Sequence, residues 1–170
     1  MDRPVHPFRL EGFPGAPVEG DLFPRFRHAR WVFRDRIAPA RPDLVLAVRQ
    51  EGPLLRLTGT KEGDAELRFD GGFVEIRAGG EAVDRILKLE GAMGDRWGSG
   101  GGGAVATLFG YDRIEVLGGR RRALVVAIDR PPLRDIYWFS DGIGWVRIRT
   151  ERRGKAVRDA LLVGFEPGGG

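Results

Sequence analysis

The chain carries carboxylates on both sides of its most aromatic stretch. Asp135 and Asp141 bracket a segment that contains Trp138, and Glu115 stands in an earlier alternating segment. Two carboxylates flanking a glycosidic bond can act as acid and base or as nucleophile, and Trp138 and Trp145 could stack on sugar rings. Most β-rich surfaces bring such carboxylates together by chance. The sequence therefore supports a carbohydrate-active protein only as an alternative, with Asp135, Asp141 and Glu115 as its acids.

The residue types that most often serve as nucleophiles, bases and metal ligands are scarce. The chain has no cysteine, two histidines, His6 and His28, and two serines, Ser99 and Ser140. Neither histidine has the spacing of a zinc ligand, and neither serine lies in a G-x-S-x-G elbow. We therefore expect no catalytic residue, no metal site and no cofactor, and we expect that the protein is not an enzyme.

A glycine-rich segment at residues 98–103 formally contains the pattern G-x-G-x-x-G. That pattern binds a pyrophosphate only between a strand and a helix, where backbone amides and the helix N-terminus face the phosphates. Here residues 104–109 follow, and they read as a strand. The segment also lacks the Lys-Ser/Thr of a P-loop, so it predicts a flexible loop.

Arginines are concentrated at residues 120–122 and at Arg147, Arg149, Arg152 and Arg153. Arginines interleaved with aromatic residues can bind single-stranded nucleic acid by stacking and charge. The net charge is only +4, however, and acidic residues are interspersed with the basic ones. The sequence therefore argues against nucleic acid as a partner, favours a solvated arginine face, and leaves polyanion binding as an alternative.

The residues around Ser140-Asp141-Gly142 predict the class of fold. Runs rich in aromatic and β-branched residues flank this tripeptide, which is typical of a β-hairpin with a tight turn. Other segments alternate apolar and polar residues and end at glycine or proline, as in an antiparallel sheet with one solvated face. The strands expected are 30–37, 44–50, 53–60, 64–69, 72–78, 84–89, 104–109, 112–117, 121–129, 134–140, 143–151 and 156–166.

The length of 170 residues suits one domain with an ample core. Five prolines make residues 1–24 an extended, proline-rich lead-in, which apolar side chains such as Leu22 and Phe23 could pin onto a surface. A single β domain is expected over 25–167 and a flexible tail over 168–170. No apolar run approaches the roughly 18 to 20 residues of a membrane span, and the N-terminus shows no signal-peptide stretch.

Three segments are informative when they are taken together: LFPRFRHARWVF at 22–33, GYDRIEVLGGRRRALVV at 110–126, and YWF with GIGWV between 137 and 146. In this order they resemble a group of small bacterial exported or lipoprotein-like proteins of unknown function. The second segment departs from the group's pattern at Asp112 and at Leu117, which replaces the usual small or proline residue. The resemblance implies a curved antiparallel sheet similar to the LolA/LolB half-barrel, with a concave face for an apolar ligand. It also implies a place outside the cytoplasm, and it carries over no catalytic residue.

We therefore expect an all-β fold: a single curved, mostly antiparallel sheet that forms a half-barrel or open barrel. The expected function is that of a non-enzymatic module that binds an apolar, amphipathic or lipid-like ligand or a partner protein. Trp31, Phe33, Trp138 and Trp145 are the expected ligand-binding residues. The alternative is a structural protein that self-assembles into a homo-oligomer through open sheet edges.

Overall fold

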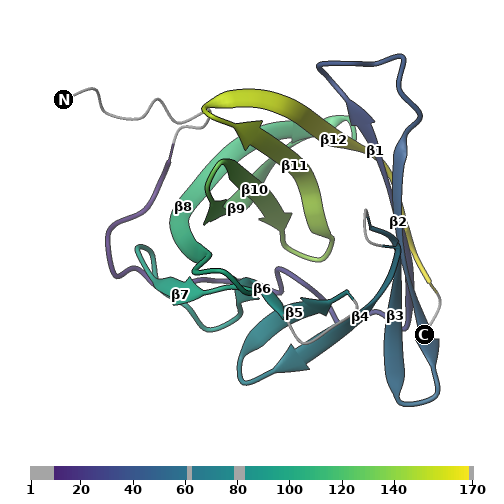
Figure 1. Ribbon diagram of the computed structural model, residues 1–170, viewed down its shortest axis with the longest axis horizontal. Coiled ribbons are helices and arrows are strands. Elements are labelled where there is room, and N and C mark those ends of the chain that lie inside the picture. The colour runs from purple at the N-terminus through teal and green to yellow at the C-terminus, as the bar shows by residue number, and fades with distance from the viewer. Residues whose placement is uncertain (1–9, 61–62, 79–82, 169–170) are drawn as a thin grey trace.

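The computed structural model describes residues 10–60, 63–78 and 83–168, and it confirms the all-β class. All the strands belong to one antiparallel sheet of 12 strands in the order β6-β5-β4-β3-β2-β1-β12-β11-β10-β9-β8-β7. The sheet curves into a nearly closed barrel (Figure 1). The strands are β1 (His28–Asp35), β2 (Leu44–Glu51), β3 (Leu54–Thr60), β4 (Gly63–Asp70), β5 (Phe73–Arg77), β6 (Asp84–Lys88), β7 (Arg96–Gly98), β8 (Val105–Val116), β9 (Gly119–Arg130), β10 (Leu133–Ser140), β11 (Gly144–Arg152) and β12 (Lys155–Pro167).

The predicted strands lie within a few residues of the observed ones, and the hairpin around Ser140-Asp141-Gly142 joins β10 to β11 as expected. One difference concerns β8, where the two segments predicted at 104–109 and 112–117 form a single strand. A bulge between Leu108 and Gly110 lets the strand bend there without ending. The short strand β7 was not expected.

The central strands are buried on both faces, whereas the sequence suggested one solvated face. In β9, every residue from Ala123 to Ile128 is 0% exposed. A continuous apolar run of this kind is typical of a strand covered on both sides. Figure 1 shows β9, β10 and β11 near the middle of the molecule, with β8 and β12 curving around one side and β2 to β5 on the other.

An aromatic core fills the barrel face of these strands. The register places Leu124, Phe139 and Trp145 on that face, where Trp145 packs edge-on against Trp31 at 5.1 Å between ring centroids. Phe23, from the lead-in, packs against Trp145 at 4.7 Å. The interior is therefore completed by a residue that precedes the first strand.

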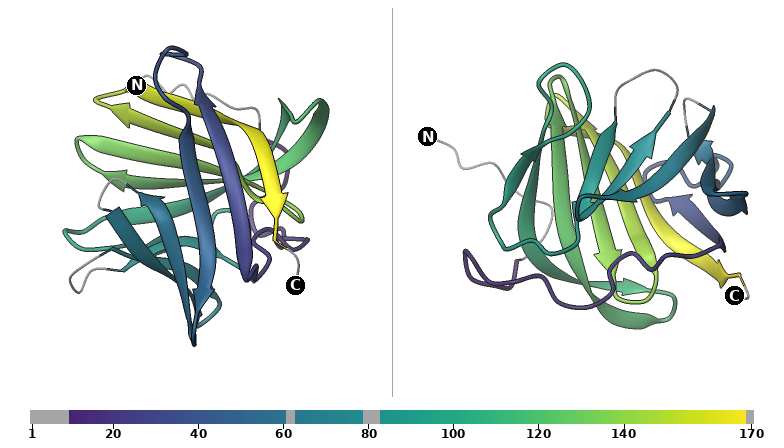
Figure 2. Two further views of the ribbon diagram at one scale, coloured as in Figure 1. Left: turned by 90° about the vertical axis from the view of Figure 1, so that its right-hand side faces the viewer. Right: turned by 90° about the horizontal axis from the view of Figure 1, so that it is seen from below.

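The lead-in crosses one end of the barrel (Figure 2). It forms isolated bridges at Glu11 with Tyr111 and at Pro17 with Ala92, and it donates the Asp21 amide to Asp141. Gly144, the first residue of β11, has a φ of +88°, and a Cβ there would lie 3.3 Å from the Phe23 ring. The described part of the lead-in thus closes this end with buried side chains.

Loop contacts bridge the gap between β6 and β7. The Arg85 carbonyl of β6 accepts hydrogen bonds from Trp97 Nε1 at 2.8 Å and from Ser99 Oγ at 3.0 Å. The Gly100 amide donates to the Val83 carbonyl at 2.8 Å. The glycine-rich segment therefore joins the two ends of the sheet.

Candidate functional site

The four aromatic residues expected to bind a ligand are fully enclosed. Trp31, Phe33 and Trp138 are 0% exposed and Trp145 is 1% exposed. Trp31 Nε1 donates to the Ile143 carbonyl at 2.8 Å. The indole N–H of Trp145 has no hydrogen-bond partner among the described residues.

The structure brings Trp31 and Trp145 together but places Trp138 on the opposite face of the sheet. Trp138 pairs in register with Val125 and Arg147, whereas Trp145 pairs with Phe139. Sequence alternation alone could not reveal this, because a bulge between Trp138 and Phe139 shifts the register. A ligand role for these residues stays a prediction.

On the second face, Trp138 belongs to a buried polar network. Its Nε1 donates to Asp112 Oδ2 at 3.0 Å, and the Arg147 guanidinium lies 4.2 Å from the ring centroid. Arg147 in turn makes two hydrogen bonds to Asp159, of 2.8 and 2.7 Å. Arg149 donates to the same carboxylate at 3.1 Å.

This network reduces the number of arginines that are available to bind a polyanion. Burial raises the pKa of Asp159, but the hydrogen bonds and charges of Arg147 and Arg149 outweigh it, so that the pKa lies below its usual value. Two of the arginines considered for polyanion binding are therefore already paired with a carboxylate. Arg152 and Arg153, at the β11–β12 turn, remain exposed.

The three candidate acids lie in different surroundings. Asp135 accepts hydrogen bonds from Thr150 Oγ1 at 2.8 Å and Arg130 at 3.2 Å. Asp141 accepts a hydrogen bond from the Asp21 amide of the lead-in. Glu115 is exposed near the β8–β9 turn.

A different polar cluster surrounds Asp135. Arg130 bridges it to Asp84, whose carboxylate lies 2.7 Å from the Arg130 guanidinium. Burial, and then the negative charge of Asp135, raise the pKa of the neighbouring Tyr137. Arg130 occupies the space between the two carboxylates, so this cluster has the character of an ion-pair network.

The remaining candidates take structural positions. Ser140 donates to the Arg122 carbonyl, Ser99 closes the barrel seam, and His28 lies in β1. His6 lies outside the described residues. Within the described ranges, no group of three or more His, Cys, Asp or Glu side chains is placed to hold a metal ion. The same residues include no helix with the length and apolar character to cross a membrane.

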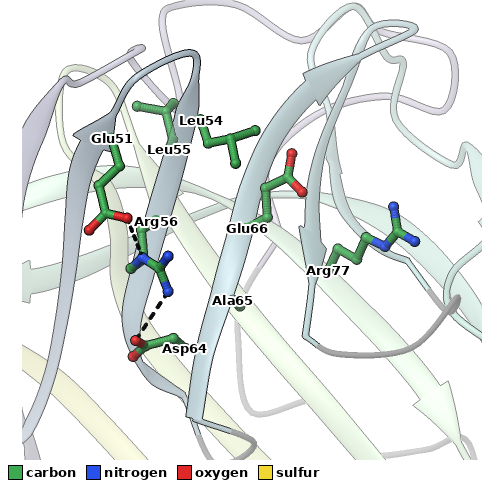
Figure 3. A pocket seen from close by; sticks show the side chains of 8 residues that line it. All are labelled: Glu51, Leu54, Leu55, Arg56, Asp64, Ala65, Glu66 and Arg77. Carbon is green, nitrogen blue, oxygen red and sulfur yellow. Dashed lines mark hydrogen bonds and ion pairs between the residues drawn. The ribbon is translucent and has the colours of Figure 1, made fainter.

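A shallow pocket lies at the β2–β4 hairpins (Figure 3). Its volume is about 180 Å³, and Arg56 bridges Glu51 at 2.7 Å and Asp64 at 3.4 Å along it. Hydrogen bonds from Arg49 and Arg56 lower the pKa of Glu51. The charged groups that line it are thus largely engaged with one another.

A larger hollow of about 690 Å³ separates the β8–β9 turn from β12. This volume is in the range of sites that take small molecules or side chains of a partner. Apolar residues predominate in it, and Glu115 and Arg120 add charge. Its lining is Glu115, Val116, Leu117, Gly118, Gly119, Arg120, Leu161, Leu162 and Val163.

Two features make the hollow unusual. Leu117 has a φ of +53°, a left-handed conformation that bulky residues rarely adopt, and yet it is 39% exposed. Val163, 42% exposed, is the extra residue of a bulge where β12 pairs with β1, because Phe33 pairs with Leu162 and Val32 with Gly164. Both sides of the hollow therefore present an apolar side chain from an irregular backbone position.

No motif or spacing in the sequence predicts a site here. The one signal was Leu117, where the chain departs from the pattern of the resembling group. The hollow itself depends on how far β8 curls toward β12, which no local pattern specifies.

No protein-family model matches the chain, and no curated protein matches it. A solved structure from Bacteroides fragilis, described as a "putative exported protein with YMCC-like fold", matches 90% of this chain and 99% of its own length. The identity is 12% and the TM-score is 0.43. A likeness this distant says nothing of a ligand or partner, so the LolA/LolB resemblance, lipidation and export of this chain stay predictions.

Proposed function

We propose that the protein is a non-enzymatic β module that binds an apolar or amphipathic group in the hollow between the β8–β9 turn and β12. The observation that carries this proposal is Leu117, an exposed leucine in a left-handed turn position that lines the hollow. Strained backbone at an exposed apolar residue stabilises nothing by itself, and such outliers cluster at binding sites.

The hollow fits this role better than the barrel interior. Trp31, Phe33 and Trp145 are enclosed by the protein's own side chains, and Phe23 packs between them and the end of the barrel. A ligand there would have to displace these contacts. In the hollow, by contrast, Leu117 and Val163 are already accessible.

Dye binding tests the proposal, with 1-anilinonaphthalene-8-sulfonate as the probe because it combines an apolar ring system with one negative charge. Leu117→Asn and Val163→Asp are each expected to weaken its binding at least fivefold, measured by fluorescence titration. Leu117→Asn is the sharper variant, because asparagine tolerates a positive φ and keeps the turn.

Two matched controls accompany these variants. Arg153→Asn changes the equivalent turn position of the β11–β12 hairpin, where φ is +50°. Leu133→Asp changes a leucine of similar exposure, 38%, in the β9–β10 hairpin. Both should leave dye binding unchanged. Binding that is insensitive to Leu117→Asn and Val163→Asp, or no binding at all, would overturn the proposal.

A further inference from the structure

We infer that the group entering the hollow belongs to an extended segment of a partner protein, which adds to β8 as an antiparallel strand opposite residues 113–117. This inference rests on the proposed function and names the partner of the same site. It follows from three observations: a strand edge with no partner among the described residues, a residue that pairs with β8 on the same side, and the side chains on the two faces of that edge.

The unpaired edge is the second half of β8. Val116 pairs with Gly119 across a two-residue turn, so the backbone groups of Val116 and Ile114 point toward β9. Those of Arg113 and Glu115 point the other way. Among the described residues, no backbone group bonds to Arg113 or Glu115 on that side. Backbone donors and acceptors without a partner among the described residues are what another extended backbone recognises.

The chain itself shows that this edge accepts a strand. Glu11 and Tyr111 exchange two backbone hydrogen bonds, of 2.6 and 3.0 Å, on the side of β8 away from β9. The Glu11 carboxylate also lies 3.0 Å from the Arg113 guanidinium. An acidic residue in an extended segment is therefore the kind of group that this edge already binds.

Side chains along the edge define the pattern of the partner. Arg113 and Glu115 are exposed on one face, whereas Ile114 and Val116 are 8% and 3% exposed on the other. Val116 lines the hollow. Opposed residues in an antiparallel pair share a face, and opposite charges favour pairing. The partner should thus present apolar residues opposite Ile114 and Val116, an acid opposite Arg113 and a base opposite Glu115.

The antiparallel direction of pairing determines the order of these residue types along the partner. An antiparallel strand meets Glu115 before Arg113, so the partner reads apolar-basic-apolar-acidic from its N-terminus. Its apolar side chains lie on the face of Val116, one of the residues that line the hollow. The chemical class of partner is an extended protein segment with alternating apolar and charged residues.

A blocked synthetic pentapeptide, Ac-Thr-Leu-Lys-Leu-Asp-NH2, is the probe, because the position opposite Asp112 is next to Glu11 and is already taken by Leu10. In the inferred register its lysine and aspartate N–H groups point at β8, and both leucine N–H groups point away. Saturable binding to the full chain is expected in an NMR titration of labelled protein. N-methylation of the lysine and aspartate should weaken binding at least tenfold, while N-methylation of the two leucines, the matched control, should leave it within about twofold.

A protein variant tests the same edge. Arg113→Pro removes an N–H that faces away from β9 and leaves the β8–β9 ladder intact, so the fold should be kept. Because Arg113 is not among the residues that line the hollow, we expect this variant to abolish peptide binding while dye binding in the hollow persists. Exchange of lysine and aspartate in the peptide should also weaken binding, because like charges then oppose Arg113 and Glu115.

Several results would overturn the inference. Equal losses from both N-methylated peptides would exclude strand addition. Dye binding without peptide binding would leave the proposed function standing and remove only the extended partner, whereas loss of both would remove both proposals. A concentration-dependent dimer abolished by Arg113→Pro would assign the edge to a second copy. Peptide binding only after deletion of residues 1–9 would assign it to the chain's own N-terminal segment.

Discussion

At the scale of single residues, two hairpin turns of the same kind differ in what they present. Leu117-Gly118 and Arg153-Gly154 both have positive φ at the two turn positions, 53° and 73° in one and 50° and 77° in the other. Two-residue turns of this geometry favour Asn-Gly. Arginine at the tip of a turn is solvated, but an exposed leucine there has no equivalent compensation. This difference between the two turns supports the proposed role of Leu117.

We predict that Leu117→Asn stabilises the fold. Relief of the left-handed leucine should raise the free energy of unfolding by about 1 kcal/mol, to be measured by urea denaturation. Arg153→Asn, the control, should give a gain of similar size. A loss of stability in Leu117→Asn would instead mean that the leucine packs productively against β12, and would contradict the view that it is retained for binding.

Residue types predicted the core of this protein but did not point to the proposed site. The large aromatics Trp31, Trp138 and Trp145 are all buried, as their β-rich surroundings suggest. Their positions relative to one another depend on a bulge, which leaves no mark in the sequence. The irregular positions at Leu117 and Val163 are equally hidden, since a positive φ at leucine and a bulge at valine both run against propensity.

At the scale of elements, an ion-pair network ties β11 to β12 on the second buried face. Arg147 lies between the Trp138 ring and Asp159. The side chains of Arg147 and Asp159 are 9% and 8% exposed. A buried ion pair of this kind adds little stability compared with a well-packed apolar pair, but removal of one partner leaves the other as an uncompensated buried charge. The network therefore favours the observed register of β11 and β12, and the stability of this pairing should depend on the protonation of Asp159.

We predict that Asp159→Asn lowers the free energy of unfolding by about 3 kcal/mol at pH 7. The pKa of Asp159 is lowered in the folded state, so its stabilising contribution is complete above the unfolded-state value near 4 and is lost as the pH falls below it. The difference between wild type and variant, measured by urea unfolding at pH 7 and pH 3, should therefore shrink at the lower pH. A difference independent of pH would contradict this role.

Elements were predictable where turn chemistry marked their ends. Pairs such as Gly71-Gly72 and Arg153-Gly154 delimited strands to within a few residues. The curl of β8 was not predictable, because residues 104–117 contain a glycine that reads equally as a turn or a bulge. In the structure Gly110 is part of a bulge, so β8 continues as a single long strand. This strand brings the β8–β9 turn to the hollow that it shares with β12.

At the scale of the whole molecule, a side chain from the lead-in fills part of the barrel interior. Phe23 is 2% exposed and touches the rings of Trp31, Phe139 and Trp145, which belong to β1, β10 and β11. The prolines predicted an extended lead-in over residues 1–24, which Leu22 and Phe23 could pin onto a surface. The sequence could not show that Phe23 enters the barrel and completes its core.

Removal of Phe23 should therefore convert the interior into a site. We predict that Phe23→Ala lowers the free energy of unfolding by about 3 to 4 kcal/mol through the cavity it leaves, whereas Phe13→Ala, at a residue 78% exposed, changes it little. The vacated space borders Trp31 and Trp145, so 1-anilinonaphthalene-8-sulfonate bound there should quench tryptophan fluorescence by energy transfer, and Val163→Asp should not prevent it. If the dye already binds in the interior of the wild type, and this binding survives Val163→Asp, the prediction that Trp31 and Trp145 bind a ligand would be supported. The proposal that the hollow is the binding site would then be overturned. If Phe23→Ala creates no such binding, the barrel collapses around the missing ring, and its interior serves packing alone.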